Sequence, residues 1–494
     1  MSSSKKSILS STSIIGGSSV VVIFFQIISS KAVALFLGPS GTGLIGALRS
    51  STTMLQTVSS LGINNSAVRD ISQANAKNNT EQLSITIKSL RKAVLFTGLL
   101  GLILTFSFAG LLSQFTFESQ EYTIEIRILS IAVFFNLIQG GQSALIQGMR
   151  RIKDLAKMSI LSALIGTLVS LPVLYVYEFD GVVYFLLSMS IGQYLVSLYY
   201  ARKIKIKDIK VSWLQVFKES KAMIKLGFSF MGGSLAAVLG AYLVRVIIIR
   251  DLSLADAGIY QAAYSISGVY IGVILQAMGK DFYPRLTEVA FKPKEEVKLI
   301  NEQTQVGMLL AAPGLMFTLA LAPLGIRLLY SAEYLEAYPV LQWMILGIFL
   351  RTISWPMGFL FVARAKGEVF FWTEIISWTL QVGLVFFGLK LFGLKGTGIG
   401  FFVLYIFYTS MMYTLMKREN NFRWTNQVVK IILGMSLLFS LAFVILQFFV
   451  QLWGSIIVSF LGVGLSYLAY LEIAKILEVK SFKQLVDLIK NRKK

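Results

Sequence analysis

The 494-residue sequence contains no cysteine and no histidine. Their absence excludes disulfide bonds, thiol nucleophiles, imidazole bases and the usual zinc ligands. The chain also lacks a G-x-x-x-x-G-K-[ST] motif, so it has no P-loop with which to hold the phosphates of ATP. These absences predict a protein that is not an enzyme, that needs no cofactor or metal, and that depends on gradients or a separate subunit for energy.

Charged residues are scarce as well. They make up 14% of the chain, and 55% of the residues are hydrophobic, whereas a soluble domain has about 25% charged residues. Apolar runs of about 20 residues recur, and each could cross about 30 Å of hydrocarbon as a helix. The runs lie at 9–36, 44–63, 93–112, 126–146, 158–176, 182–200, 226–249, 258–278, 306–329, 340–362, 369–391, 399–415, 428–450 and 456–473. They predict an all-α integral membrane protein with about fourteen transmembrane helices.

The charges that are present have an uneven distribution. The 46 Lys and Arg against 25 Asp and Glu give a net charge of +21, which in a soluble protein would suggest a nucleic-acid partner. Here the basic residues gather in alternate loops, while the loops between them are acidic, as at Glu118 and Glu121. Because cytoplasmic loops carry the excess of Lys and Arg, the pattern predicts no nucleic-acid partner and both termini in the cytoplasm. Arg127 and Arg327, close to the outer surface, are expected to be interfacial anchors.

Polar connections divide the predicted helices into groups. The longest basic connection follows six helices, which predicts an N-terminal six-helix lobe at 1–203 and a basic cytoplasmic linker at 204–225. A second six-helix lobe at 226–417 is then followed by two additional helices at 418–476. The basic, amphipathic tail at 477–494 would lie on anionic lipids of the cytoplasmic leaflet, and a solvated tail is an equal alternative.

Short similarities relate the two predicted lobes. Two glycines and a serine at 16–18 recur at 232–234, and residues 43–50 have a counterpart in 258–265. The offsets of about 216 and 215 residues span six helices, an even number, so the halves would be parallel in the membrane. Two such pseudo-symmetric lobes would leave a cleft in which a substrate could be presented to each side in turn.

Four basic residues fall inside predicted helices, where a charge is costly and is a functional candidate by default. They are Lys31, Arg49, Arg245 and Arg351. We expect them to form a cationic, substrate-binding cavity, with Arg49 the strongest candidate because it needs an anion or water. Lys31 and Arg245, nearer the outer ends of their helices, could instead extend to the headgroups.

Amide side chains follow the second and fourth predicted helices at three- and four-residue spacing, which places them on one face. Such stripes either join helices through hydrogen bonds or line a wet cavity, and both interpretations are open here. The residues assigned to a polar cavity lining are Gln56, Asn64, Asn136, Gln139, Gln142 and Gln261.

Acidic residues inside the predicted helices are fewer, and the clearest are Glu374 and Asp281. Each could pair with a buried cation or take part in coupling to H+ or Na+. The cavity would thus be net cationic and bordered by aromatic rings at Trp355, Trp372 and Trp378. Arginines for a phosphate or pyrophosphate, amides for hydroxyls and aromatic faces for sugars suit a phosphorylated glycan.

Several segments resemble the Wzx-type O-antigen and enterobacterial common antigen translocases of the multidrug/oligosaccharidyl-lipid/polysaccharide exporter superfamily. They are L-G-P-S-G-T-G-L at 37–44, the stretch 58–69, Arg245 followed by D-A-G-I-Y at 256–260, and A-K-G-E-V-F-F-W-T-E at 365–374. The resemblance covers roughly residues 10–415. It implies alternating access that moves undecaprenyl-pyrophosphate-linked oligosaccharide from the cytoplasmic to the periplasmic leaflet of the bacterial inner membrane, with other polysaccharide-assembly membrane proteins as partners.

The last predicted helix pair departs from many such translocases, whereas lipid II flippases of the same superfamily have two extra helices, so a lipid II-type substrate stays open. A drug or cation antiporter of the same architecture would need more intramembrane carboxylates than cations. A glycan polymerase or ligase would need a large periplasmic loop, and the predicted outer loops are short. A structural scaffold would have no polar cavity.

Overall fold

A computed structural model describes residues 3–76, 79–207, 213–449 and 451–476. The described residues form α-helices, two short 3-10 helices and connecting turns, and none of them lies in a strand. The chain divides into two compact units, residues 1–258 and 259–494. The tail predicted at 477–494 and part of the linker predicted at 204–225 lie outside the described residues.

Unit 1 contains α1 (Ser3–Ser60), α2 (Ile63–Ala76), α3 (Thr80–Ser107), α4 (Ala109–Phe117), α5 (Thr123–Gly148), α6 (Ile152–Tyr177), η1 (Glu178–Gly181), α7 (Val182–Arg202), α8 (Trp213–Asp251) and the start of α9 (Leu254–Glu288). Unit 2 contains the rest of α9, α10 (Pro293–Ala320), α11 (Ala322–Leu329), η2 (Ala332–Tyr334), α12 (Ala337–Ala363), α13 (Gly367–Phe392), α14 (Lys395–Asn420), α15 (Asn426–Phe448) and α16 (Gln451–Ile476).

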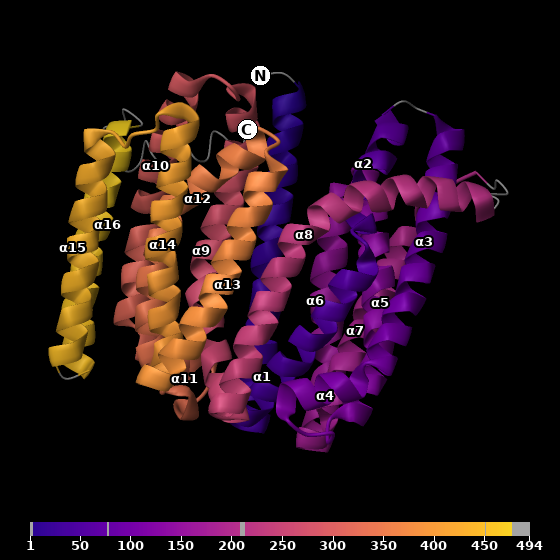
Figure 1. The fold of residues 1–494 in the computed structure, drawn as a ribbon, viewed down its shortest axis with the longest axis horizontal. Helices are drawn as coiled ribbons and strands as arrows, with labels where there is room; N and C mark the ends of the chain where they lie inside the picture. Colours follow the sequence, from indigo (N-terminus) through magenta and orange to yellow (C-terminus); the bar gives the residue numbers. More distant parts are fainter. Residues whose placement is uncertain (1–2, 77–78, 208–212, 450, 477–494) are drawn as a thin grey trace. The chain divides into compact units, whose positions relative to one another are not determined.

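Helix α1 is two helical segments joined at a sharp bend. Gly38 has φ 63° and ψ −165°, outside the helical region, and Pro39 follows it. Glycine adopts this backbone without a Cβ clash, and proline cannot donate the next helical hydrogen bond. In Figure 1 the start of α1 and helix α2 both lie at the upper end of unit 1. The bend therefore reverses the chain, and the predicted spans 9–36 and 44–63 lie on either side of it.

The segment after this bend makes a close backbone contact with the start of α9. A Cβ placed on Gly43 would lie 1.9 Å from the carbonyl oxygen of Leu254, and one placed on Gly258 would lie 2.0 Å from the carbonyl oxygen of Pro39. The contact is reciprocal, and Gly43 and Gly258 are the residues that the sequence offset of about 215 relates to each other. Both positions need glycine because backbone atoms occupy the space of a side chain.

Gly43→Val is therefore expected to destabilise the protein by about 3 kcal/mol, the upper range for forcing extra atoms into a packed site. Gly17→Val, in the same helix, is the matched control, since no atom of the described residues lies within 4 Å of a Cβ there. Thermal unfolding in detergent should show a lower midpoint for Gly43→Val alone. Equal midpoints for the two variants would mean that the two backbones can separate without cost.

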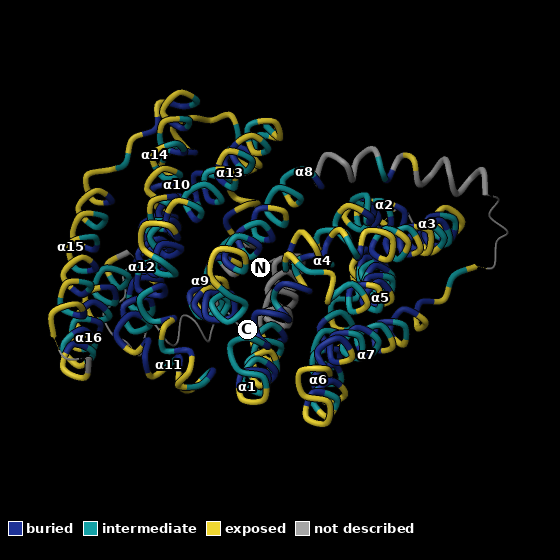
Figure 2. The backbone as a smooth tube through the Cα atoms, turned by 60° about the horizontal axis from the view of Figure 1, so that its bottom comes forward, coloured by how far each residue is buried: buried dark blue, intermediate teal, exposed yellow. Residues whose placement is uncertain are grey.

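Helix α12 forms the centre of unit 2. In its apolar window 61% of the residues are buried, against 22% for α13, α15 and α16. Figure 2 shows buried residues along α12 and long exposed stretches along α15. Phe349 of α12 stacks on Phe439 of α15, and Gln447 donates to Gln342 at 3.1 Å. Helix α15 thus packs on the core of unit 2.

The same backbone features recur in the two units at the sequence offset. Helix α13 begins about 215 residues after α6 begins, and it ends about 215 residues after α6 ends. Arg150 and Ala365, in the turns before them, have φ 55° and 54°. Glu178 and Gly393, directly after them, have φ 47° and 58°. Matching left-handed residues at both ends of the two helices indicate that the turns, as well as the helices, are repeated.

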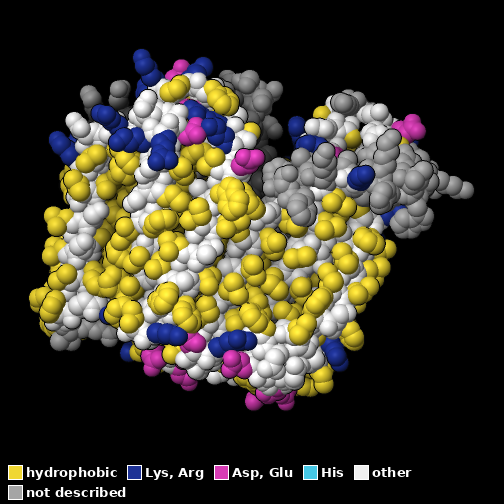
Figure 3. Space-filling view, in the orientation of Figure 1, with side chains coloured by type: hydrophobic (Ala, Val, Ile, Leu, Met, Phe, Trp, Pro, Cys, Tyr) yellow, Lys and Arg dark blue, Asp and Glu magenta, His cyan; other side chains and the backbone are white. Residues whose placement is uncertain are grey.

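The length and polarity of the helices fit a membrane. Ten helices of the described chain are long and apolar enough to cross one, or up to twelve if each of two bent pairs is a single span. On the face of unit 2 in Figure 3, hydrophobic side chains cover the middle of the helices, and Lys and Arg gather at one end. The protein is a multi-pass membrane protein built from helices.

Candidate functional site

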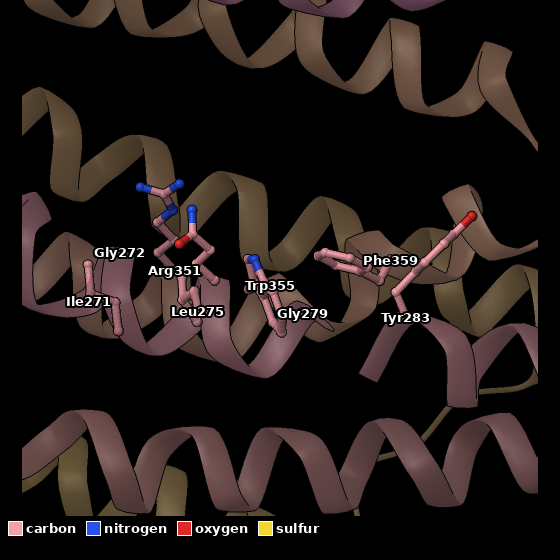
Figure 4. A pocket seen from close by; sticks show the side chains of 9 residues that line it. Ile271, Gly272, Leu275, Gly279, Tyr283, Arg351, Trp355 and Phe359 are labelled. Atoms are coloured by element: carbon pink, nitrogen blue, oxygen red, sulfur yellow. The ribbon is translucent and has the colours of Figure 1, made fainter. Parts of the chain in front are cut away.

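A pocket of about 450 Å³ lies within unit 2 between α9 and α12 (Figure 4). From α12 it is lined by Arg351, Trp355 and Phe359, which are four residues apart and therefore share one helix face. From α9 it is lined by two glycines, Gly272 and Gly279, and by larger residues. The remaining lining residues are Ile271, Leu275, Gln276 and Tyr283.

Arg351 supplies the positive charge of this pocket. In the part of the chain that the structure describes, its guanidinium has no hydrogen-bonded or ion-paired partner. Its electrostatic neighbours include Tyr405, Tyr264, Tyr408 and Glu374. A guanidinium is planar and carries five donors, which suits the oxygens of a phosphate. The donors of Arg351 are therefore available to an anionic ligand, while Glu374 provides a nearby compensating charge.

Aromatic rings form the other half of the pocket. The ring centroids of Trp355 and Phe359 are 4.5 Å apart, and those of Tyr283 and Phe359 are 6.2 Å apart. Gly279 allows α9 to lie close to α12, since a Cβ at Gly279 would be 3.3 Å from Cζ2 of Trp355. Figure 4 shows the order along the pocket, with Arg351 at one end, Trp355 in the middle and Phe359 with Tyr283 at the other. The pocket combines an anion-binding end with ring faces that suit sugars.

Unit 1 contains a comparable arginine on α1. The side chain of Arg49 is exposed, and its Nη2 lies 3.1 Å from the Sδ of Met189. A thioether is only a weak acceptor, and no carboxylate forms an ion pair with Arg49 among the described residues. Arg49 is thus a second cation in a membrane-spanning segment that an anionic ligand could engage.

The other two predicted cavity cations lie elsewhere in unit 1. Lys31 is half-buried in the first segment of α1. Arg245 lies in α8, and its Nη1 donates to the carbonyl oxygen of Ala241, one turn earlier, at 2.9 Å. Neither residue lines the pocket of unit 2, so their role in binding stays a prediction.

The predicted amides are placed at contacts between and along helices. Ser197 donates to Gln142, which joins α7 to α5, and Asn64 packs against Gly140, where a Cβ would lie 2.6 Å from its Nδ2. Gln261 donates to Ser265 within α9 at 2.9 Å. Side chains that bond across helices stabilise a bundle. The other three predicted amides, Gln56, Asn136 and Gln139, are half-buried, and no side-chain hydrogen bond across helices is seen for them among the described residues.

Of the two predicted acids, Glu374 is near Arg351 and Asp281 is not. Asp281 is 76% exposed and forms an ion pair with Arg285 at 3.3 Å, one turn further along α9. Trp372 is exposed as well. Sequence reasoning missed Gln276 and the Tyr264, Tyr405 and Tyr408 hydroxyls around Arg351, although the seven-residue spacing of Gly272 and Gly279 could have marked a hollow face of α9.

A buried ion cluster joins four helix ends of unit 2, and sequence reasoning missed it too. Arg364, after α12, donates to both oxygens of Glu296 at 2.8 and 2.6 Å and to Glu419 at 3.1 Å. Lys366 donates to Glu419 at 2.6 Å, and Asn420 to Glu296 at 3.2 Å. The hydrogen bonds and charges of Glu296 and Glu419 hold the pKa of Arg364 above its usual range. The side chain of Glu296 is 0% exposed and that of Arg364 is 6% exposed, so the cluster is structural.

Known proteins resemble this chain in sequence and in fold. A model of the family described as "Polysaccharide biosynthesis protein" matches residues 8–290. The "Lipid III flippase" of Escherichia coli (strain K12) is 25% identical over 395 residues, 78% of this chain and 92% of that protein. The "Succinoglycan biosynthesis transport protein ExoT" of Rhizobium meliloti (strain 1021) is 26% identical over 167 residues, 34% of each.

Two solved structures share the fold. A structure of "Lipid II flippase MurJ, inward closed conformation" has a TM-score of 0.68 at 14% identity and covers 93% of this chain and 97% of its own. An inward-facing multidrug resistance MATE family transporter of the MOP superfamily has a TM-score of 0.68 at 12% identity, covering 81% and 94%. These relatives are transporters and flippases, in agreement with the prediction that the chain is not an enzyme.

Proposed function

The chain belongs to the polysaccharide biosynthesis protein family, and on that premise we propose that it is a flippase for lipid-linked oligosaccharide. Its substrate is undecaprenyl-pyrophosphate-linked oligosaccharide of the O-antigen repeat-unit type, which it moves from the cytoplasmic to the periplasmic leaflet by alternating access. The observation that carries this proposal is the pocket in which Arg351 stands beside Trp355 and Phe359. The relatives that are flippases support a lipid-linked substrate.

The chemistry of the pocket matches the parts of such a substrate. A pyrophosphate brings negative charge into a region of low dielectric, where it needs a cation, and Arg351 supplies one. The sugars next to the pyrophosphate have apolar ring faces, which stack on Trp355 and Phe359, and hydroxyls, which bond to amides such as Gln276. Unit 1 provides a further cation in a membrane-spanning segment, Arg49. An organic cation would instead meet like charges at both arginines.

Topology follows from the length of the helices. The spans Gly17–Ser60 and Ile152–Arg202, with 44 and 51 residues, are each about twice the length of one crossing, and two bent pairs add one crossing each. We propose about fourteen crossings, in six-helix lobes at 1–203 and 226–417 with linker 204–225, two further helices at 418–476 and a tail at 477–494. An even number of crossings agrees with both termini in the cytoplasm.

Glu374 is the candidate for ion coupling. Its carboxylate is an electrostatic neighbour of Arg351, so binding a proton or Na+ there would release Arg351 from its counter-charge and favour an anionic substrate. Asp281 is exposed and already paired with Arg285, and we propose no more than a minor part for it. Anionic lipids and other polysaccharide-assembly membrane proteins are the further partners we propose.

A lipid II-type flippase is the second candidate. The solved lipid II flippase covers 93% of this chain, whereas the MATE transporter covers 81%. Helices α15 and α16 pack on α12 and α10 of unit 2. Parallel assays with lipid II and with an O-antigen-type carrier would separate the two substrates.

Gly272 offers a direct test of the pocket. No described atom lies within 4 Å of a Cβ at Gly272, which lines the pocket, or at Gly268, one turn earlier, which does not. Gly272→Leu is expected to fill the pocket and lower the rate of leaflet exchange in liposomes at least tenfold, because substrate must displace the new side chain. Gly268→Leu adds the same side chain outside the pocket, at the 42° bend of α9, and should leave the rate within about twofold.

Equal rates for the two leucine variants would remove the pocket from the transport path. Equal folding is checked by thermal unfolding in detergent, in which both variants should match the unmodified chain.

A further inference from the structure

A second hollow of unit 2 opens between α11 and the first half of α16. It encloses about 560 Å³ and is lined from α11 by Pro323, Leu324 and Arg327 and from α16 mainly by Leu452, Ile456 and Phe460. Leu324 is 62% exposed and Phe460 72% exposed. These apolar side chains face the surroundings of the bundle, and they belong to membrane-spanning helices, so the hollow is a groove open to lipid.

A bend in the chain creates this groove. Helix α10 ends at Ala320, and α11 turns away from it by 77°. The short helix α11 buries Ile326 toward the bundle and exposes Leu324 and Leu328, with Arg327 beside them. A short helix with an apolar side and a cation, lying across the bundle, has the character of an interfacial helix. Arg327 is therefore at the depth of lipid headgroups, and the groove extends from it along α16.

The length of the groove fits one acyl chain. The lining positions of α16 recur at three- and four-residue spacing from Leu452 to Val463, which is about 16 Å of helix. This is half of the roughly 30 Å hydrocarbon core, the depth of a single leaflet. A long polyprenyl chain would extend well beyond such a groove, whereas one chain of a phospholipid fills it.

The charge of the groove favours an anionic phospholipid over a zwitterionic one. Arg327 is the only charged residue among the described lining residues, and Ser455 and Ser459 are the only hydroxyls. A lipid phosphate would meet the guanidinium, but the ammonium group of a zwitterionic headgroup would find no carboxylate in the lining. Unit 1 has the matching helix break between α3 and α4, yet the position equivalent to Arg327, at an offset of about 213 residues, is Gln114. The cation is thus specific to the unit that carries α16.

We propose that this groove binds one anionic phospholipid of the outer leaflet, such as phosphatidylglycerol, with its phosphate at Arg327 and one acyl chain along α16. The bound lipid joins α11 to α16 and so stabilises the attachment of the last helix pair. The proposal concerns a surface apart from the pocket at Arg351, and it holds whichever glycan the protein carries.

The test uses the full chain, purified in detergent and depleted of lipid. Phosphatidylglycerol, phosphatidylcholine and inorganic phosphate are added separately, and bound lipid is measured by native mass spectrometry together with the thermal midpoint. Phosphatidylglycerol is expected to bind the unmodified chain and raise its thermal midpoint. Phosphatidylcholine and inorganic phosphate are expected to do neither. Arg327→Gln should weaken this binding about tenfold, the usual effect of losing one charge-assisted hydrogen bond, and Ser459→Phe should block the groove.

Arg127→Gln is the matched control, because Arg127 is an exposed arginine of unit 1 that lies over Phe106 and outside the groove. It should bind phosphatidylglycerol as the unmodified chain does. Undiminished binding by both Arg327→Gln and Ser459→Phe would overturn the proposal. A midpoint shift with inorganic phosphate alone would assign a simple anion site, and full displacement by undecaprenyl phosphate would assign the groove to the carrier lipid; either result contradicts a phospholipid site.

Discussion

Arg351→Gln is expected to slow leaflet exchange of lipid-linked oligosaccharide about 100-fold. Arg351 is the only cation of the unit 2 pocket among the described residues, and its guanidinium has no bonded acidic partner there. Removing one member of a desolvated charge pair costs about 2–5 kcal/mol, and about 2.8 kcal/mol corresponds to a factor of 100. Arg351→Lys keeps the charge but loses the planar fork, so it should retain an intermediate rate.

The controls separate transport from folding. Arg127→Gln removes an exposed arginine of unit 1 and should leave the rate unchanged. Arg351→Gln also leaves Glu374 without its compensating charge, so the double variant Arg351→Gln with Glu374→Gln tests whether any loss of stability comes from that carboxylate. If Arg351→Gln is folded, inserted and as fast as the unmodified chain, the pocket does not bind the pyrophosphate.

Glu296→Gln is expected to have the largest effect on stability, a loss of about 3–5 kcal/mol. Glu296 is fully buried and accepts two hydrogen bonds from Arg364. Without its negative charge, the Arg364 guanidinium keeps, among the described residues, only Glu419 as an acidic partner in a buried site. The cluster joins the ends of α10, α12, α13 and α14, so its loss should loosen the packing of all four helices.

Asp281→Asn is the matched control for this prediction. It breaks the Asp281–Arg285 pair, whose side chains are 76% and 50% exposed, and exposed pairs contribute only about 0–1 kcal/mol. Thermal unfolding in detergent should therefore give a much lower midpoint for Glu296→Gln than for Asp281→Asn. Similar midpoints would show that the buried cluster adds no more than a surface pair does.

The membrane class and the helical content were predictable from the sequence because apolar length reports directly on the thickness of a bilayer. The bend at Gly38 and Pro39 was also accessible, since glycine and proline interrupt a helix for known steric reasons. The offset of about 215 residues was visible in short glycine-containing segments, and the same offset recurs in the left-handed turns at Arg150 and Ala365.

The side-chain environment of each charge was not predictable in the same way. Arg351 was identified because a cation in an apolar run stands out, but its neighbours Tyr264, Tyr405 and Tyr408 come from helices distant in sequence. Arg364 and its partner Glu296 are 68 residues apart, and no periodicity in the sequence relates them. Periodicity places a residue on a face of its own helix, and it does not specify which other helix covers that face.

Leaflet exchange in liposomes tests the proposed function most directly. A fluorescent undecaprenyl-pyrophosphate oligosaccharide is placed in one leaflet, and its accessibility to a membrane-impermeant quencher is followed with and without the purified chain. We predict rapid exchange that requires the protein and falls about 100-fold with Arg351→Gln. No exchange with any lipid-linked glycan, together with uptake of an organic cation, would contradict the proposal and identify an antiporter of the same fold.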